Sequence, residues 1–162
     1  MRVVDILVNE FERASHLPWQ IVILRLVGAV LLGGVIGLER EITKDTGGLR
    51  TNMLIALASA ALALITLELV AGYDIKDDRI RMDPLRLVEA VTAGVAFLAA
   101  GVVVFAKGSV RGLTTGAAMW VAAAIGLGAG FGHWLIAVVM TVLGVLILSI
   151  LRIIEYRAGL RD

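Results

Sequence analysis

The sequence predicts an all-α integral membrane protein, a bundle of about five transmembrane helices. Of its 162 residues, 59% are hydrophobic and only 18% are charged. A soluble domain has roughly 45–50% apolar and about 25% charged residues. The mean hydropathy of the chain is +0.93. Because one bilayer span takes about 20 mostly apolar residues, five spans account for most of the chain.

The first 18 residues predict an amphipathic helix that lies on the membrane surface. Apolar residues recur at helical spacing from Val3 to Phe11, opposite a charged face. Asp5 and Glu10 stand where a cleaved signal peptide would be positive, so a signal peptide is not expected. Pro18 suits the start of the helix that follows.

Five apolar runs follow, and charged or turn-forming segments separate most of them. They are Trp19–Leu38, Thr51–Gly72, Leu85–Ala106, Leu113–Gly130 and Gly132–Leu151. The transmembrane domain is therefore expected at 19–151, with a short cytoplasmic tail at 152–162. The boundary at 126–133 is only a glycine-rich stretch, and a re-entrant bend there stays open as an alternative.

The distribution of Lys and Arg predicts the orientation of the bundle, since positive residues accumulate on the cytoplasmic side. With five spans, eight of them fall on the side of the C-terminus, which we expect to be cytoplasmic: Arg40, Lys44, Arg50, Lys107, Arg111, Arg152, Arg157 and Arg161. Six fall on the other side: Arg2, Arg13, Lys76, Arg79, Arg81 and Arg86.

Small residues recur at spacings that let helices approach closely, which is how helices associate in lipid. They form stripes in the first, third and fourth spans: Gly33 and Gly37; Ala93, Ala96, Ala100 and the adjacent Gly101; Gly112, Gly116, Ala123, Gly126 and Gly130. Such stripes serve packing within one protomer or a homodimer, and the pattern does not separate the two.

Three ionisable residues lie within the apolar runs: Arg25, Glu68 and Glu89. Because a charge inside a span usually faces a partner or a water-filled cavity, we hypothesise an interhelical pair between Arg25 and Glu89, with Glu68 nearer the surface. The alternatives are that Glu89 pairs with Arg86, three residues before it, or that Glu89 belongs to a cation or proton site.

Composition argues against several classes of function. The net charge of +1 and the aromatic content of 6% give no basis for nucleic-acid binding. The chain has no cysteine, which excludes disulfides, thiolate metal sites and cysteine nucleophiles. No nucleophile–base motif, phosphate loop or dinucleotide fingerprint is present, so an enzyme is not expected. The acidic residues between 74 and 83 alternate with Lys and Arg, which favours a solvated loop over a cation site.

Three segments in order resemble the MgtC/SapB family of bacterial membrane proteins: GGVIGLERE with GGLRTNML, then GVAFLAAGVV, then VRGLTTGAAMWVAAAIGLGAGFG. The likeness runs from about Gly33 to Gly132. It implies an inner-membrane protein of about five spans with a cytoplasmic C-terminus. The charged and hydroxyl positions of its motifs here are Glu39, Arg40, Arg50, Thr51, Arg111, Thr114 and Thr115.

By resemblance, the function is an accessory or regulatory role in magnesium homeostasis, growth and virulence under low magnesium. The family also implies a partner in the bilayer, such as the ATP synthase or a magnesium transporter, and we expect a homo-oligomer, with a dimer favoured. No cofactor is expected, although Mg²⁺ is a possible ligand. The alternatives are a small cation or proton transporter that uses Glu89, and a structural membrane scaffold.

Two departures from the family pattern stand out. Where many members read SGIGFLGAG, this chain reads AGVAFLAAG, with alanines at Ala93, Ala96 and Ala99. Larger members also have a soluble C-terminal domain, where this sequence continues only through 152–162. The motif residues gather at the cytoplasmic ends of the predicted spans, where they either fix the geometry between helices or form a docking or ion-entry surface.

Overall fold

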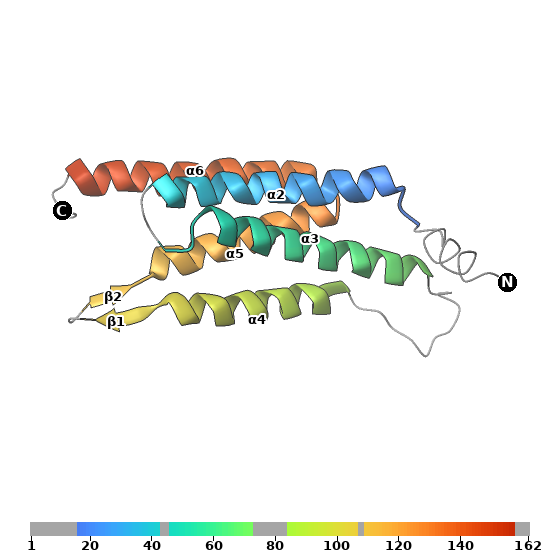
Figure 1. Cartoon of the computed structure of the whole chain (residues 1–162), viewed down its shortest axis with the longest axis horizontal. Helices are drawn as coiled ribbons and strands as arrows, with labels where there is room; N and C mark the ends of the chain where they lie inside the picture. Colours follow the sequence, from blue (N-terminus) through green and yellow to red (C-terminus); the bar gives the residue numbers. More distant parts are fainter. Residues whose placement is uncertain (1–15, 43–45, 73–83, 107–108, 158–162) are drawn as a thin grey trace, which may run out of the picture.

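A computed structural model describes residues 16–42, 46–72, 84–106 and 109–157 (Figure 1). Its helices and strands are α2 (Trp19–Ile42), α3 (Leu49–Gly72), α4 (Pro84–Val102), β1 (Val104–Ala106), β2 (Ser109–Arg111), α5 (Leu113–Gly130) and α6 (Trp134–Arg157). All five helices are long and apolar enough to cross a membrane. The predicted all-α bundle of five spans is confirmed. The interfacial helix expected at 1–18 falls mostly outside the described residues.

The helices run alternately up and down, so that α2, α4 and α6 run in one direction and α3 and α5 in the other (Figure 1). One end of the bundle therefore holds the α2–α3 connection, the β1–β2 hairpin and the end of α6; we call it the Arg40 end. The other holds the start of α2, the end of α3 and the α5–α6 turn; we call it the Arg25 end.

Helices α2 and α3 pack closely because glycines of α2 face α3. A Cβ atom at Gly33 would lie 2.5 Å from Cβ of Ala56, and one at Gly37 would lie 2.7 Å from Cα of Leu49. Neither position has space for a side chain. The glycine pair that the sequence analysis singled out thus lies at a helix contact within one protomer.

Helix α5 is the centre of the bundle and contacts α2, α3, α4 and α6. Its Gly126 lies against the backbone of Ala56, and its Gly130 lies between Ala60 and Ala63. Around these contacts the core consists largely of small residues, with Ala29, Ala60, Ala118 and Ala129 almost fully buried. Small residues therefore make up most of this core, together with the fully buried Ile36 and Ile125.

Helix α4 is a more peripheral element, in contact mainly with α5 (Figure 1). The third span was predicted to end at Ala106, but the helix ends at Val102 and residues 104–106 pair with 109–111 as an antiparallel hairpin. The prediction was wrong because it counted hydrophobicity alone. A run of valines followed by phenylalanine favours extended backbone, and glycine follows at Gly108 and Gly112.

The glycine-rich stretch at 126–133 is the end of α5 followed by a tight turn at 131–133, and not a re-entrant bend. The N–H of His133 donates to the carbonyl of Gly128 (2.7 Å), and that of Gly132 donates to the carbonyl of Ala129 (3.0 Å). This is the Schellman pattern of a helix C-terminus. It requires positive φ at Gly132, which is +82°. Helix α6 begins two residues later.

Candidate functional site

The Arg40 end contains a polar cluster formed by the buried residues Arg40 and Thr115 and by the exposed Thr46. The guanidinium of Arg40 donates a 3.0 Å hydrogen bond to the hydroxyl of Thr115, and the hydroxyls of Thr46 and Thr115 are 3.3 Å apart. Arg40 is 5% exposed and Thr115 is 2% exposed. The cluster joins the last turn of α2, the α2–α3 connection and the first turn of α5.

Asn52 holds the α2–α3 connection beside this cluster. Its side-chain amide donates to the carbonyls of Gly47 (2.6 Å) and Gly48 (2.9 Å), and the side chain is fully buried. Gly47 has φ of +70°, and a Cβ atom there would lie 2.7 Å from Cγ2 of Thr115. The connection is thus fitted against the start of α5. Sequence reasoning missed Asn52, although an amide just inside an apolar run was the available signal.

Glu41 caps the start of α3 at the same end. Its carboxylate accepts a 3.1 Å hydrogen bond from the N–H of Leu49. A carboxylate at a helix N-terminus satisfies one of the unpaired N–H groups and complements the helix dipole. The sequence analysis did not single out Glu41, because its carboxylate reaches across a connection whose conformation the sequence leaves open.

The other charged and hydroxyl residues of the three segments surround this cluster without joining it. Arg50, Arg111 and Thr114 are exposed, and Thr51 is half-buried. Glu39 is also half-buried, and its Oε2 atom is buried without a hydrogen-bond partner. The structure therefore divides the seven predicted residues into a packed pair, Arg40 with Thr115, and a set of mostly exposed neighbours.

The comparison with protein families matches this same part of the chain. Residues 26–157 match the model of the MgtC family. That match covers α2 from Leu26 onward, α3, α4, the hairpin, α5 and α6. This chain belongs to the MgtC family. The resemblance found in the three segments is thereby confirmed.

Individual MgtC-family relatives show the same extent of similarity. The chain is 41% identical over 122 residues to Protein SapB of Bacillus subtilis, covering 73% of this chain and 52% of that protein. It is 36% identical over 137 residues to Protein MgtC of Brucella abortus, covering 82% and 54%. It is 34% identical over 139 residues to the Putative magnesium transporter YhiD of Escherichia coli K12, covering 83% and 62%.

The alignments therefore span between about half and three-fifths of the length of these MgtC-family relatives. No solved structure matches the chain. Within the described residues, no three or more His, Cys, Asp or Glu side chains converge on one point. The described part of the bundle thus offers no ready-made centre to which a magnesium ion can be assigned.

At the Arg25 end of this MgtC-family bundle, Arg25 caps the C-terminus of α5. Its guanidinium donates a 2.9 Å hydrogen bond to the carbonyl of Gly130. It also lies against Gly132, where a Cβ atom would be 2.6 Å from Nη2. A cation beside the last carbonyls of a helix satisfies an unpaired acceptor and complements the dipole. Arg25 lies one residue before the family match begins.

The hypothesised pair between Arg25 and Glu89 is wrong. Glu89 is exposed on α4, and in the part of the chain that the structure describes no ion pair joins it to Arg25 or to Arg86. The prediction matched the two residues by depth and by opposite charge. The carbonyls at the end of α5 provide Arg25 with an acceptor that the sequence pattern did not reveal.

Glu68 connects the end of α3 to the segment before α2. Its carboxylate accepts hydrogen bonds from the N–H of His16 (2.8 Å) and of Leu17 (3.0 Å), and it lies 3.3 Å from Nδ1 of His16. The three ionisable residues that the sequence grouped therefore have separate environments: a helix cap, a clamp on the chain before α2, and an exposed position on α4.

Proposed function

We propose that this protein is an accessory or regulatory membrane protein of magnesium homeostasis, which adapts other membrane machinery to low magnesium. Membership of the MgtC family supports this proposal, because two relatives carry the names Protein MgtC and Putative magnesium transporter YhiD. We ascribe no enzymatic activity to the chain.

The observation that carries the proposal is the sealed centre of the bundle. At Gly126 and Gly130, α5 meets the backbone of α3 with no space for a single added carbon atom. The polar residues Ser59 and Thr141 are buried, and the hydroxyl of Thr141 donates to the carbonyl of Ala137 within its own helix. These contacts leave no space for a hydrated ion between α3 and α5 at Gly126 and Gly130, which supports a regulatory role over conduction at this place in the protomer.

The exposed motif residues suggest where a partner protein would bind. Arg50 at the start of α3, Arg111 in β2 and Thr114 at the start of α5 are exposed at the Arg40 end. Thr114 adjoins Thr115, whose buried hydrogen bond with Arg40 joins α2 to α5 at this end. We assign to this surface the contact with the regulated membrane protein, such as an ATP synthase or a magnesium transporter.

The same residues support a location in the bacterial inner membrane, with the Arg40 end and the C-terminus in the cytoplasm. Arg50, Arg111 and Arg152 are exposed at that end, in keeping with the preference of Lys and Arg for cytoplasmic flanks. Accessibility of single cysteines introduced at Arg152 and at His133 to a membrane-impermeant reagent checks this orientation.

A cation transporter is the second candidate, and the name of the Escherichia coli relative favours it. The residue suggested for that role, Glu89, is exposed on α4 and is not among the residues that line the groove between α4 and α5. Transport through Glu89 would therefore need a path along the surface of α4.

The test combines flux with growth at limiting magnesium. We expect that liposomes containing the folded protein take up no more Mg²⁺ than empty liposomes, while the same protein restores growth of a strain that lacks its own family member. Arg50→Glu and Arg111→Glu should abolish this growth without loss of thermal stability. Arg152→Glu, a charge change at the same end outside the three motif segments, is the matched control. Magnesium uptake that disappears in Glu89→Gln would instead establish the transporter.

A further inference from the structure

Helix α4 has a long face that no other described part of the protomer covers. Its opposite face packs against α5 and α3 through the buried Val91 and Val95, and through Ala99, which lies against Gly116. The uncovered face consists of exposed residues: Arg86, Glu89, Ala90, Ala93, Ala96, Phe97 and Ala100. The small-residue stripe that the sequence placed on this helix is therefore not used for packing within the described protomer.

The uncovered face has the spacing of a helix–helix seam. Arg86, Glu89, Ala93, Ala96 and Ala100 are separated alternately by three and four residues, the spacing of positions a and d in a heptad repeat. Three of the five are alanines, which permit close approach of two backbones in lipid. A second α4 helix that runs in the same direction fits such a seam.

Two copies of the chain that are inserted into a membrane in the same orientation provide two α4 helices that run in the same direction. A two-fold axis along the membrane normal places α4 of one protomer parallel to α4 of its partner, and it brings the same surface of each together. The seam, which we define as Arg86, Glu89, Ala93, Ala96 and Ala100, then packs against itself.

The charges of the seam are complementary to themselves under the same symmetry. Arg86 and Glu89 are exposed within the first two turns of α4 and make no ion pair in the described part of the chain. They are three residues apart, or roughly 4.5 Å along the helix axis. Arg86 of one protomer can therefore reach Glu89 of the partner subunit, and the symmetric pair forms at the same time. Such pairing satisfies ionisable groups that are otherwise costly on a lipid-facing surface.

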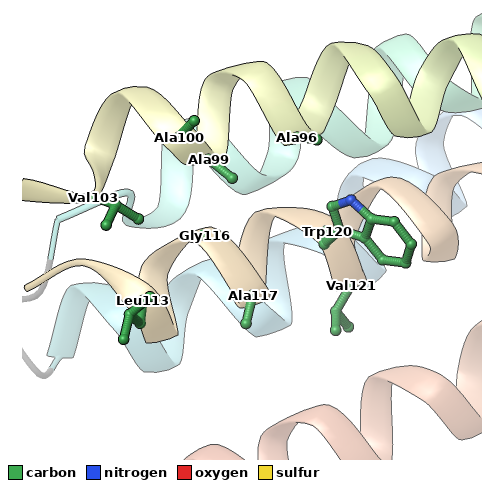
Figure 2. Close-up of a pocket in the computed structure, with 9 residues that line it drawn as sticks. All are labelled: Ala96, Ala99, Ala100, Val103, Leu113, Gly116, Ala117, Trp120 and Val121. Carbon is green, nitrogen blue, oxygen red and sulfur yellow. The ribbon is translucent and has the colours of Figure 1, made fainter. Parts of the chain in front are cut away.

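A groove beside the seam provides space for a further contact. It lies between α4 and α5, has a volume of about 560 Å³, and is lined by Ala96 and Ala100 of the seam and by Gly116, Ala117 and Trp120 of α5 (Figure 2). Phe97, which is 80% exposed, lies on the opposite flank of the seam. When two α4 helices pack in parallel through the seam, the Phe97 side of one helix faces the groove side of the other. Phe97 of one protomer therefore faces the groove of its partner.

We propose that two copies of this chain form a parallel dimer through α4. Ala93, Ala96 and Ala100 lie at the closest approach, reciprocal ion pairs join Arg86 and Glu89 at the Arg25 end, and Phe97 occupies the groove of the other protomer. The proposal rests on the exposed face of α4 and its self-complementary charges, and it is independent of the proposed function.

The experiment is disulfide cross-linking of the full chain in liposomes. Since the sequence contains no cysteine, Ala93→Cys and Ala100→Cys each introduce a single thiol on the seam. Leu98→Cys is the matched control, because Leu98 is 51% exposed on the same helix but points away from the seam. We expect oxidation to give a covalent dimer at positions 93 and 100 in at least tenfold higher yield than at 98.

Charge changes then test the reciprocal pairs in the Ala93→Cys background. Arg86→Glu places four negative charges at the crossing, and Glu89→Arg places four positive charges there, so each should reduce the dimer yield several-fold. The double variant Arg86→Glu with Glu89→Arg restores alternating charges and should restore the yield. Equal yields at positions 93 and 98, or a yield that neither single change lowers, would each overturn the proposal.

Discussion

The guanidinium of Arg40 and the hydroxyl of Thr115, 75 residues apart in the chain, form a buried hydrogen bond of 3.0 Å that joins α2 to α5. Both residues belong to motif segments of the MgtC family match. The bond is made at the end of the bundle where the α2–α3 connection is clamped by Asn52. It therefore holds the end of α2 against the start of α5, next to the connection that Asn52 holds.

Loss of the Thr115 hydroxyl should destabilise the bundle. Hydrogen bonds to charged groups contribute about 1.5–3 kcal/mol, whereas interhelical bonds within membranes average about 0.6 kcal/mol. For this buried, charge-assisted bond we expect Thr115→Val to lower the free energy of unfolding by about 1–2 kcal/mol. Equilibrium unfolding in mixed SDS micelles, followed by circular dichroism, measures the change.

The neighbouring threonine provides the control for that measurement. Thr114 is exposed, so Thr114→Val should change the free energy of unfolding by less than about 0.5 kcal/mol. Thr115→Ser retains the hydroxyl and should recover most of the loss. Equal effects of Thr114→Val and Thr115→Val would mean that the Arg40 bond contributes nothing specific to stability.

Arg25 and Glu89 should behave as independent residues. Arg25→Leu removes the cap on Gly130 and should cost about 0.3–2 kcal/mol, the range for a cation at a helix C-terminus. Because Arg25 bonds to α5 and Glu89 is exposed on α4, the effects of Arg25→Leu and Glu89→Gln should add within about 0.5 kcal/mol. A double-mutant cycle measures this additivity. A coupling energy well above about 0.5 kcal/mol would mean that Arg25 and Glu89 do interact, in contradiction to their separate positions in the structure.

Glu68 should hold the backbone of residues 16–17, just before α2, in a fixed conformation. Its two carboxylate oxygens accept from the N–H groups of His16 and Leu17, and an amide side chain offers only one acceptor oxygen. We expect Glu68→Gln to increase hydrogen exchange at residues 16–17 several-fold, and Glu68→Ala to increase it further. Hydrogen exchange with mass spectrometry checks this, and exchange in the α5–α6 turn is the internal reference.

Much of the fold could be predicted from the sequence because a membrane span is specified by a long run of apolar residues. The bounds of α5 agree exactly with the predicted run at Leu113–Gly130. The end of α4 did not follow from hydropathy, because the valines after Gly101 are as apolar in a strand as in a helix. The decisive feature was the pairing of 104–106 with 109–111, a backbone contact that hydropathy does not report.

The site was less predictable, since polar contacts between helices depend on rotation and register. Family-like segments correctly drew attention to Arg40 and Thr115, but nothing in the sequence showed that these two would meet while Arg50 and Arg111 remained exposed. Asn52 and Glu41 were missed because their acceptor and donor are backbone groups in a connection and a helix terminus. A sequence pattern shows which side chains are present, but it does not indicate which of them bond to backbone groups.

Two glycines of similar helical context should respond in opposite directions to alanine, which tests the packing of the bundle. At Gly126 a Cβ atom would collide with the backbone of Ala56, whereas at Gly94 nothing lies within 4 Å. Alanine gains about 0.5–1 kcal/mol over glycine within a helix, but overpacking costs about 1–3 kcal/mol. Gly126→Ala should therefore lower the free energy of unfolding in mixed SDS micelles, because α3 and α5 must separate, and Gly94→Ala should raise it. If Gly126→Ala instead stabilised the protein, α3 and α5 would not be in backbone contact at Gly126, and the centre of the bundle would not be closed there.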